Sequence, residues 1–466
     1  MDSRRNQDKI SSLPDFILVL IISNLPLNEV VKTSILLKRW KNIYRKSITN
    51  DIVFKESDFV TCYASNDEET KRVTRVSFIC FMLGWVLRLS GRAIESFDLY
   101  ISKPVGFETH INSLMEFAVS KQIKNLVLDF SDPSWTTSNE ARSEASVVQL
   151  PECVYNLINL ESLKLFACGF DPSRLTNPGS LKVLSFGWIQ LEEIMSLIST
   201  TPMLESLSIQ NCWDVGLEVI TEYNNRLREL VFENCGFSVP FSTLDLPNIL
   251  IFKYSGKVHY FEFLSVNRIM TEAYLDFGAE TEYDDETGTQ LCGLLYDLLS
   301  ARTLTVCPFL IQLIQDGEDP VRLREPMETR HLVMKTNLLP NEFVGIRLMI
   351  NSCPDLETLT FQMVAPRPVP MATSAIAPDT YWKFNINHRC LKKTLKVVEL
   401  KNFTGGLYEL HVLEFLIRRG RVLERVDLYL ANGLEQSRKD LATAEAQKVR
   451  TFEKASEHLT ITLHNG

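Results

Sequence analysis

The residues of this chain that could do chemistry are first of all its cysteines and histidines. Ten cysteines and seven histidines are present, and both residue types can bind metal ions or act in nucleophilic and acid-base catalysis. Zinc sites and redox motifs usually pair two cysteines as C-x-x-C, and no such pair occurs in the chain. The histidines are scattered, and His411 lies in an apolar stretch where a packing role is expected. The sequence therefore predicts reduced thiols and no metal or cofactor.

Sequence motifs for catalysis are also missing. The chain contains no G-x-x-x-x-G-K-[ST], G-x-G-x-x-G, H-E-x-x-H or G-x-S-x-G, so phosphate-loop, dinucleotide, zincin and hydrolase interpretations lose their usual support. We expect a protein that is not an enzyme.

Three cysteines share one position in a repeated pattern. Cys168, Cys212 and Cys235 each lie five residues after a leucine, within segments that match L-x-x-L-x-L-x-x-N/C if Ile209 and Phe232 count as the third apolar residue. This is the pattern of leucine-rich repeats, in which the last position is buried. The three thiols are therefore predicted to be buried.

The pattern extends into a longer series of candidate strands. Successive central apolar positions are separated by 21, 23, 23, 22 and 23 residues, within the range of roughly 20 to 29 expected for leucine-rich repeats. Helical stretches such as 191–203 and 342–355 lie between strands. We predict an irregular α/β solenoid with a strand and a helix in each repeat. The central positions are Leu163, Leu184, Leu207, Leu230, Phe252 and Leu275, with further strands around Phe97, Leu126, Leu304, Leu332, Leu359, Val398 and Val426.

The neighbours of the central positions define a candidate binding surface. Side chains alternate between the two faces of a strand, so residues next to a buried leucine must lie on the opposite, concave face. This face is the expected docking surface of a solenoid, although any single residue there could simply be solvated. The candidate target-binding residues are Ser162, Lys164, Ser185, Ser208, Glu229, Val231 and Lys253.

Residues 8–54 form a short apolar segment with two Leu-Pro steps. Proline suits the first turn of a helix and not its interior, so helices are predicted to begin near Pro14 and Pro26. A helical hairpin of this size cannot bury all of its apolar side chains alone and needs a partner. That partner is either another protein or the rest of the chain, for which the segment would be an N-terminal cap.

The segment resembles an F-box. The resemblance rests on the order of Leu13-Pro14-Asp15, Leu25-Pro26-Leu27, Thr33-Ser34 and Lys38-Arg39-Trp40. It implies docking on the Skp-type adaptor of a cullin ubiquitin ligase. The chain departs from the family pattern at Leu37, where a serine is usual, and at Tyr44, where tryptophan is frequent. The residues matching the adaptor-binding face are Leu13, Pro14, Ile17, Leu25, Pro26 and Ile35.

The C-terminal part, in 390–430 and 454–466, resembles the FBD module of plant F-box proteins. A segment rich in proline and small residues, 365–378, precedes it and suggests a boundary. Together the resemblances identify the family as plant F-box/FBD/leucine-rich-repeat proteins. The expected division is an F-box at 8–54, a solenoid at 75–364, a linker or loop at 365–386 and an FBD module at 387–466. We expect the last strands and helix to cap the solenoid.

Charge and composition limit the partners. A formal net charge of −9 gives no general attraction to nucleic acid or anionic lipid. The N-terminus lacks a signal-peptide core, and 16–22 is too short to span a bilayer. We expect a protein of the cytoplasm, the nucleus or both, neither secreted nor bound to a membrane.

These observations favour one function and leave a second open. The first is a substrate receptor of a Skp-cullin-F-box (SCF) ubiquitin ligase, in which the F-box binds the adaptor and, through it, the cullin, while the repeats hold an unknown target protein. Proximity to the conjugating enzyme then promotes ubiquitin transfer. The alternative is a stand-alone protein-interaction scaffold that does not assemble into a ligase.

Overall fold

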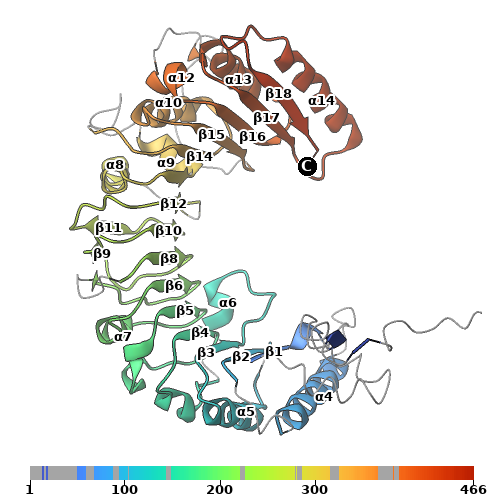
Figure 1. The fold of residues 1–466 in the computed structure, drawn as a ribbon, viewed down its shortest axis with the longest axis vertical. Coiled ribbons are helices and arrows are strands. Elements are labelled where there is room, and N and C mark those ends of the chain that lie inside the picture. Colours follow the sequence, from blue (N-terminus) through green and yellow to red (C-terminus); the bar gives the residue numbers. More distant parts are fainter. Residues whose placement is uncertain are drawn as a thin grey trace, which may run out of the picture. The chain divides into compact units, whose positions relative to one another are not determined.

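A computed structural model of the chain describes residues 13–14, 17–18, 50–58, 68–87, 94–102, 104–142, 148–220, 226–278, 280, 286–314, 325–365, 381–382 and 388–465. The chain divides into two compact units. The first consists of Met1–Leu204 with Asn211–Trp213, and the second of Glu205–Gln210 with Asp214–Gly466. Each unit is a stack of parallel strands flanked by helices and turns (Figure 1).

In the first unit, five short strands pair in parallel in their chain order. The second and fourth residues of each strand are apolar and buried, and Phe97, Leu126, Leu163 and Leu184 align in register with 0% exposure. The strands are β1 (Asp51–Lys55), β2 (Ser96–Tyr100), β3 (Asn125–Asp129), β4 (Ser162–Phe166) and β5 (Val183–Gly187). The helices are α4 (Glu68–Val86), α5 (Glu108–Ser120), α6 (Ser138–Arg142) and α7 (Ile194–Thr200), with 3-10 helices at Glu56–Asp58, Glu152–Asn156, Pro172–Arg174 and Pro178–Ser180.

The second unit continues the same pattern with ten parallel strands, each of which pairs with the one that follows it along the sheet. They are β6 (Ser206–Gln210), β8 (Glu229–Glu233), β10 (Ile251–Ser255), β12 (Glu272–Asp276), β13 (Thr303–Val306), β14 (His331–Thr336), β15 (Thr358–Met363), β16 (Val397–Phe403), β17 (Arg425–Leu430) and β18 (Thr460–His464). The helices are α8 (Thr287–Asp297), α9 (Pro308–Leu313), α10 (Phe343–Ser352), α12 (Arg389–Lys393), α13 (Leu407–Arg419) and α14 (Gln436–Arg450), with a 3-10 helix at Pro340–Glu342.

Helices cover one face of the strands because their apolar residues recur three and four positions apart. In α5 these are Ile111, Leu114, Met115 and Ala118, all buried. In the second unit, α9 and α10 approach closely at Gly345, where an added Cβ atom would lie only 1.8 Å from the Ile311 carbonyl oxygen. A glycine at this position therefore sets the spacing of the two helices.

The predicted strands are confirmed, with one change of position. Every predicted central residue lies in a strand of the sheet and is fully buried. The register, however, places Ala273 opposite Phe252, and Leu275 opposite Tyr254. The prediction of Leu275 as the central residue was therefore wrong by two positions. The cause is that Ala273, Leu275 and Phe277 are all apolar and fully buried, so the alternation alone does not show which of them is the central residue of the repeat.

The expectation of a helix in every repeat is also wrong for part of the second unit. There the main strands are joined by β7 (Val219–Ile220), β9 (Phe241–Leu244) and β11 (Tyr260–Phe263), which form a three-stranded sheet in the order β11-β9-β7. The physical reason is the period-two alternation of exposed and buried residues from Tyr260 to Phe263, which suits a strand.

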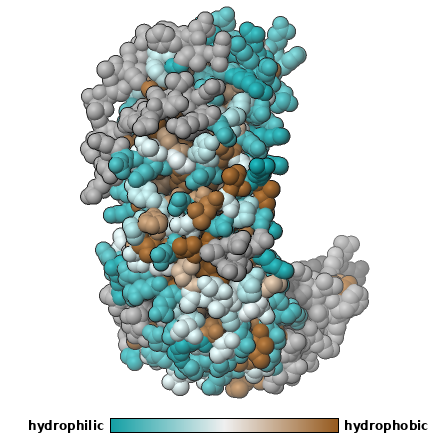
Figure 2. Space-filling model, turned by 90° about the vertical axis from the view of Figure 1, so that its left-hand side faces the viewer, coloured by the Kyte–Doolittle hydropathy of each residue, from teal (hydrophilic) through white to brown (hydrophobic). Residues whose placement is uncertain are grey.

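This small sheet carries exposed apolar side chains. Phe241 and Tyr260 lie opposite each other in its register and are 51% and 36% exposed. Leu264, Val266 and Ile269 follow β11 and are also exposed. Figure 2 shows apolar side chains on the face that carries β9 and β11.

The sheet also extends beyond the limits expected for the solenoid. The sequence placed 51–54 in the F-box and began the solenoid at 75, whereas β1 starts at Asp51 and pairs with β2. At the other end, β15 pairs directly with β16 in parallel, so the sheet runs on past 365–386 into the part assigned to the FBD module. In this part α14 packs against β17 and β18.

Within the part of the chain that the structure describes, none of the helices combines the length and the apolar character needed to cross a membrane.

Candidate functional site

The candidate surface is the side of each sheet opposite the buried leucines, which we call the open face. In the first unit it carries Lys164 of β4, which lies between Val127 of β3 and Ser185 of β5 in the parallel register. Ser162, two residues earlier on β4, lies opposite Val183. Leu163 and Leu165 point into the core and are fully buried, so the predicted alternation on β4 is confirmed.

In the second unit the open face carries the four remaining predicted residues. Ser208, Val231 and Lys253 lie side by side on β6, β8 and β10. The row continues through Tyr274 on β12 and Thr305 on β13. Glu229 belongs to the neighbouring row, where it lies opposite Ser206. Within each unit, the predicted residues therefore share one face of the sheet.

The predicted charged residues are engaged with their neighbours. The Lys253 ammonium lies 2.9 Å from Glu272 Oε1, and both side chains are 36% exposed. Ser206 donates a hydrogen bond of 2.8 Å to Glu229 Oε2. Burial raises the pKa of Asp98 on β2, and the Lys164 ammonium opposes that rise. Any partner that binds here must replace these local contacts by equivalent ones.

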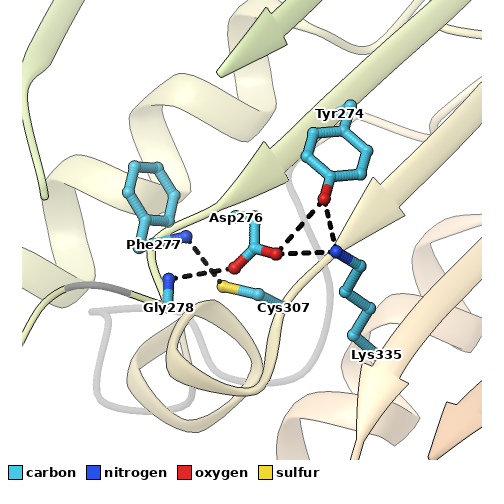
Figure 3. Close-up of polar contacts among 6 residues, drawn as sticks. All are labelled: Tyr274, Asp276, Phe277, Gly278, Cys307 and Lys335. Atoms are coloured by element: carbon cyan, nitrogen blue, oxygen red, sulfur yellow. Dashed lines mark hydrogen bonds and ion pairs between the residues drawn. The ribbon is translucent and has the colours of Figure 1, made fainter. Parts of the chain in front are cut away.

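The sequence did not reveal a three-residue cluster on the open face of the second unit, Tyr274, Asp276 and Lys335 (Figure 3). Lys335 Nζ lies 2.7 Å from Asp276 Oδ2 and also contacts the Tyr274 hydroxyl, which donates to Asp276 Oδ2 at 3.2 Å. The Lys335 ammonium lies 4.7 Å from the centre of the Tyr274 ring. The backbone N–H of Gly278 donates to Asp276 Oδ1 at 2.9 Å.

The cluster is held in its charged form. Burial raises the pKa of Asp276, but the hydrogen bond and charge of Lys335 outweigh this effect, so the pKa lies below its usual value. For Lys335, burial acts in the opposite direction, and the contacts with Asp276 and Tyr274 nevertheless raise its pKa. The two residues are 59 positions apart in sequence, and only the pairing of β12, β13 and β14 brings them together.

A second polar group lies on the open face of the last strands. Asp427 of β17, whose side chain is only 4% exposed, accepts from His464 of β18 at 3.0 Å and lies 2.5 Å from Arg425 Nε. The His464 ring stacks on Tyr429 at 4.5 Å. Charged and aromatic side chains thus continue on this face to the end of the second unit.

The candidate adaptor-binding residues are described only in part. The Pro14 carbonyl accepts hydrogen bonds from the N–H groups of Ile17 and Leu18 at 3.1 and 3.2 Å, so a helical turn begins at Pro14 as predicted. Leu13 is half-buried beside it. Leu25, Pro26 and Ile35 lie outside the described residues.

The repeats match a known family. The family model described as "At1g61320/AtMIF1, LRR domain" covers residues 88–456. The chain is 51% identical to F-box protein At3g62230 of Arabidopsis thaliana over the full length of both proteins. The chain belongs to the plant F-box/LRR-repeat protein family.

Two further relatives from Arabidopsis thaliana support this assignment. "Putative F-box/LRR-repeat protein At1g56400" is 45% identical, with 96% of this chain and 95% of the relative covered. F-box/FBD/LRR-repeat protein At1g13570 is 24% identical, with 90% of each covered. The FBD module is thus named in a more distant relative of this F-box/LRR-repeat protein.

The cysteines predicted to be buried are buried in this F-box/LRR-repeat protein. Cys168, Cys212 and Cys235 are 1%, 1% and 6% exposed. Burial raises the pKa of Cys168 to about 12, which keeps the thiol protonated and unreactive. Among the described residues, no group of three or more His, Cys, Asp or Glu side chains could hold a metal ion.

One pair resembles a serine-histidine dyad but has the wrong hydrogen bonds. Ser242 Oγ lies 2.9 Å from His259 Nε2, and Ser242 donates its hydroxyl proton to the Leu217 carbonyl at 2.6 Å. His259 Nε2 must then be the donor to Ser242, whereas a general base would have to accept the serine proton. Ser242 is also fully buried. The pair therefore stabilises the three-stranded sheet and its surroundings.

Two buried carboxylates have a similar structural role. Glu342 accepts from the Thr336 hydroxyl and from the N–H groups of Asn337 and Leu339. Glu409 accepts from the N–H groups of Thr404, Gly405 and Gly406. Each carboxylate satisfies the backbone of the turn between a strand and the next helix, so its burial is explained without a catalytic role.

Proposed function

We propose that this chain is the non-catalytic substrate-recognition subunit of an SCF-type ubiquitin ligase. The N-terminal F-box, residues 8–54, would bind a Skp-type adaptor and through it a cullin scaffold. The repeats would hold a target protein. The observation that carries the proposal is the combination of an F-box motif order at the N-terminus with a repeat array that matches F-box relatives over its whole length.

The adaptor contact is assigned to the apolar face of the F-box. A segment of this length exposes more apolar surface than it can bury internally, and a partner helix would cover it. The residues assigned to this contact are Leu13, Pro14, Ile17, Leu25, Pro26 and Ile35.

The target contact is assigned to the open face. The assigned residues are Ser162, Lys164 and Ser185 in the first unit, of which Ser185 is only 8% exposed, and Ser208, Glu229, Val231 and Lys253 in the second. Small polar, charged and aliphatic groups alternate there, which suits an uneven protein surface. The net charge of −9 disfavours a nucleic acid as the partner.

The part assigned to the FBD module, 387–466, would close the C-terminal end of the repeats. In support, α14 packs against β17 and β18, and its exposed residues include the charged Arg438, Asp440 and Lys448. A polar outer surface on the last repeat is what a solenoid requires of a cap.

The decisive experiment is co-purification of a Skp-type adaptor with the full chain. Combined Leu13→Ala and Pro14→Ala replacement should abolish co-purification, because it removes apolar contact area and the residue that begins the helix. The matched control is Ser11→Ala with Ser12→Ala, which changes neighbouring residues outside the motif. Lys253→Glu should also retain the adaptor. Wild-type protein that captures a target but never the adaptor would instead establish the scaffold function.

A further inference from the structure

The first unit contains a recurrent turn in which one residue has an unexpected type. Three residues adopt a left-handed backbone conformation directly after a strand. They are Ala167 after β4, Trp188 after β5 and Asn211 after β6, with φ of 53°, 57° and 52°. Asparagine tolerates this conformation well, whereas a bulky side chain is sterically disfavoured. The backbone strain at Trp188 must therefore be offset by favourable contacts of its ring. Backbone strain of this kind is often retained at binding sites.

The Trp188 ring forms part of the wall of a cavity. It packs edge to face on Trp135, with ring centres 5.6 Å apart. The cavity has a volume of about 600 Å³, and Trp188, Trp213, Phe170 and Arg142 contribute to its lining. Backbone bridges between Gln149 and Gly169 and between Gln190 and Trp213 tie its segments together. The cavity lies at the C-terminal ends of the strands, not on the open face.

The charges around the cavity favour a cation. Of the described charged residues that line it, Asp171, Glu192 and Glu193 are acidic and Arg142 is cationic. Asp171 uses one oxygen to accept from Ser173, and Glu192 accepts from Gln190 at 2.7 Å. Glu192 and Glu193 are exposed and available to a ligand from solvent.

A contact within the protein already places a cationic group against an aromatic ring of this cavity. The guanidinium carbon of Arg142 lies 5.5 Å from the centre of the Trp213 ring, in the range of a cation-π contact. Trp213 is 7% exposed and is therefore used internally. Trp188 is only half-buried and offers a second ring on the same cavity. An electron-rich ring beside carboxylates is the usual recognition chemistry for guanidinium and ammonium groups.

We propose that this cavity is a binding site for an organic cation, a guanidinium or ammonium group, held against Trp188 and neutralised by Glu192 and Glu193. The cation could belong to an arginine or lysine side chain of a bound polypeptide or to a free amine. The described residues that line the cavity include none that are assigned to adaptor binding, so failure of the cation site would leave the proposed receptor function standing.

The test is a titration of the full chain at constant ionic strength, followed by calorimetry and tryptophan fluorescence. The probes are a capped arginine amide, its neutral isostere capped citrulline amide, and a capped glutamate amide. The arginine probe should bind, and the two other probes should bind at least tenfold more weakly. Equal binding of citrulline, or preferential binding of glutamate, would overturn the proposal.

Variants then locate the site. Trp188→Asn should weaken binding of the arginine probe at least tenfold yet leave the melting temperature near wild type, because asparagine suits this turn as it does at Asn211. Trp188→Phe should retain most of the affinity, since it keeps a ring. Glu192→Gln with Glu193→Gln should weaken binding at least fivefold. The matched control, Glu95→Gln with Glu116→Gln, removes the same charge from exposed positions outside the cavity and should have no effect.

A comparison of two ligands distinguishes the sources of the cation. A capped Gly-Arg-Gly tripeptide and the free amine agmatine carry the same guanidinium group. Tighter binding of the tripeptide indicates a polypeptide ligand, and tighter binding of agmatine a small amine; both results support the site. Unchanged affinity for both in Trp188→Asn and in the double glutamine variant would contradict it.

Discussion

Lys335 on β14 reaches across β13 to Asp276 at the end of β12, so that the ammonium nitrogen lies 2.7 Å from the carboxylate. Between them, β13 ends at Val306, and its last residue on the open face, Thr305, lies between Tyr274 and Val333 in the parallel register. The two charged side chains are 18% and 22% exposed. An ion pair that spans three strands ties neighbouring repeats together on the face opposite the core.

Breaking this pair should reduce stability. We expect Lys335→Met and Asp276→Asn each to lower the free energy of unfolding by about 1–2 kcal/mol, since a single replacement leaves one charge partly buried without its partner. The double variant should lose less than the sum, with a coupling energy of about 1 kcal/mol. Urea denaturation of the four proteins measures this. Additive effects would show that the contact contributes nothing to stability.

The pair also predicts a dependence on acid. The pKa of Asp276 is lowered in the folded state, so its contribution is present above the pKa of an unfolded aspartate, about 3.9. It is lost as the pH falls through the lower folded value. The coupling energy should therefore persist from pH 7 to pH 5 and decline in stronger acid.

Charge reversal on the open face tests the proposed target contact. Lys164→Glu, Glu229→Lys and Lys253→Glu together should weaken capture of a target while adaptor binding is retained. The loss of stability should stay near 1 kcal/mol, because the Lys253–Glu272 pair is exposed. Arg438→Glu on α14 is the control with the same net change in charge. Should capture survive the triple variant but fail after deletion of 280–288 or 365–378, the contact belongs to those segments.

Thiol reactivity should follow burial along the chain. Cys80 is exposed on α4, whereas Cys168 is 1% exposed with its pKa raised to about 12. At pH 8 the Cys168 thiol therefore stays protonated, whereas the thiolate is the form that reacts. Iodoacetamide labelling followed by mass spectrometry should modify Cys80 first and Cys168 only after unfolding. Equal labelling rates in the native protein would contradict the buried repeat position.

Strand positions could be predicted because each strand centre carries a large apolar residue at a nearly constant spacing, as at Leu163, Leu184 and Leu207. The predicted central residue was wrong at Leu275, because a small residue, Ala273, occupies the central position of that strand. The three-stranded sheet was missed because β7, β9 and β11 contain only two to four residues each. Such short segments give little periodicity to detect.

The open face was predictable where it follows directly from alternation, as for Lys164 and Lys253. The Asp276–Lys335 pair was not, because its partners are 59 residues apart and the distance depends on the register of three strands. The cavity beside Trp188 was missed for a related reason. A left-handed backbone at a tryptophan leaves no mark in the sequence, since the same turn is built by Asn211.

A buried histidine should make the protein sensitive to mild acid. Burial lowers the pKa of His259 to about 4, and the ring stacks on Phe237 with centres 3.8 Å apart. An unfolded histidine has a pKa near 6.5, so between pH 6.5 and 4 the unfolded state binds a proton that the folded state does not. The free energy of unfolding should therefore fall with decreasing pH, by up to about 1.4 kcal/mol per pH unit from this group.

The variant His259→Gln isolates this contribution. A glutamine amide can still donate to Ser242 but does not titrate, so the variant should be less stable than wild type at pH 7.5 and lose less stability on acidification to pH 4.5. His388, whose pKa is also lowered to about 4 by burial, and Asp297, whose pKa is raised to about 6 by burial, are unchanged between the two proteins. These two groups change stability in opposite directions as the pH falls. Each acts equally in wild type and variant, so neither contributes to the difference between the two proteins. Urea midpoints measured every half pH unit give the two curves, and parallel curves would show that His259 does not couple folding to protonation.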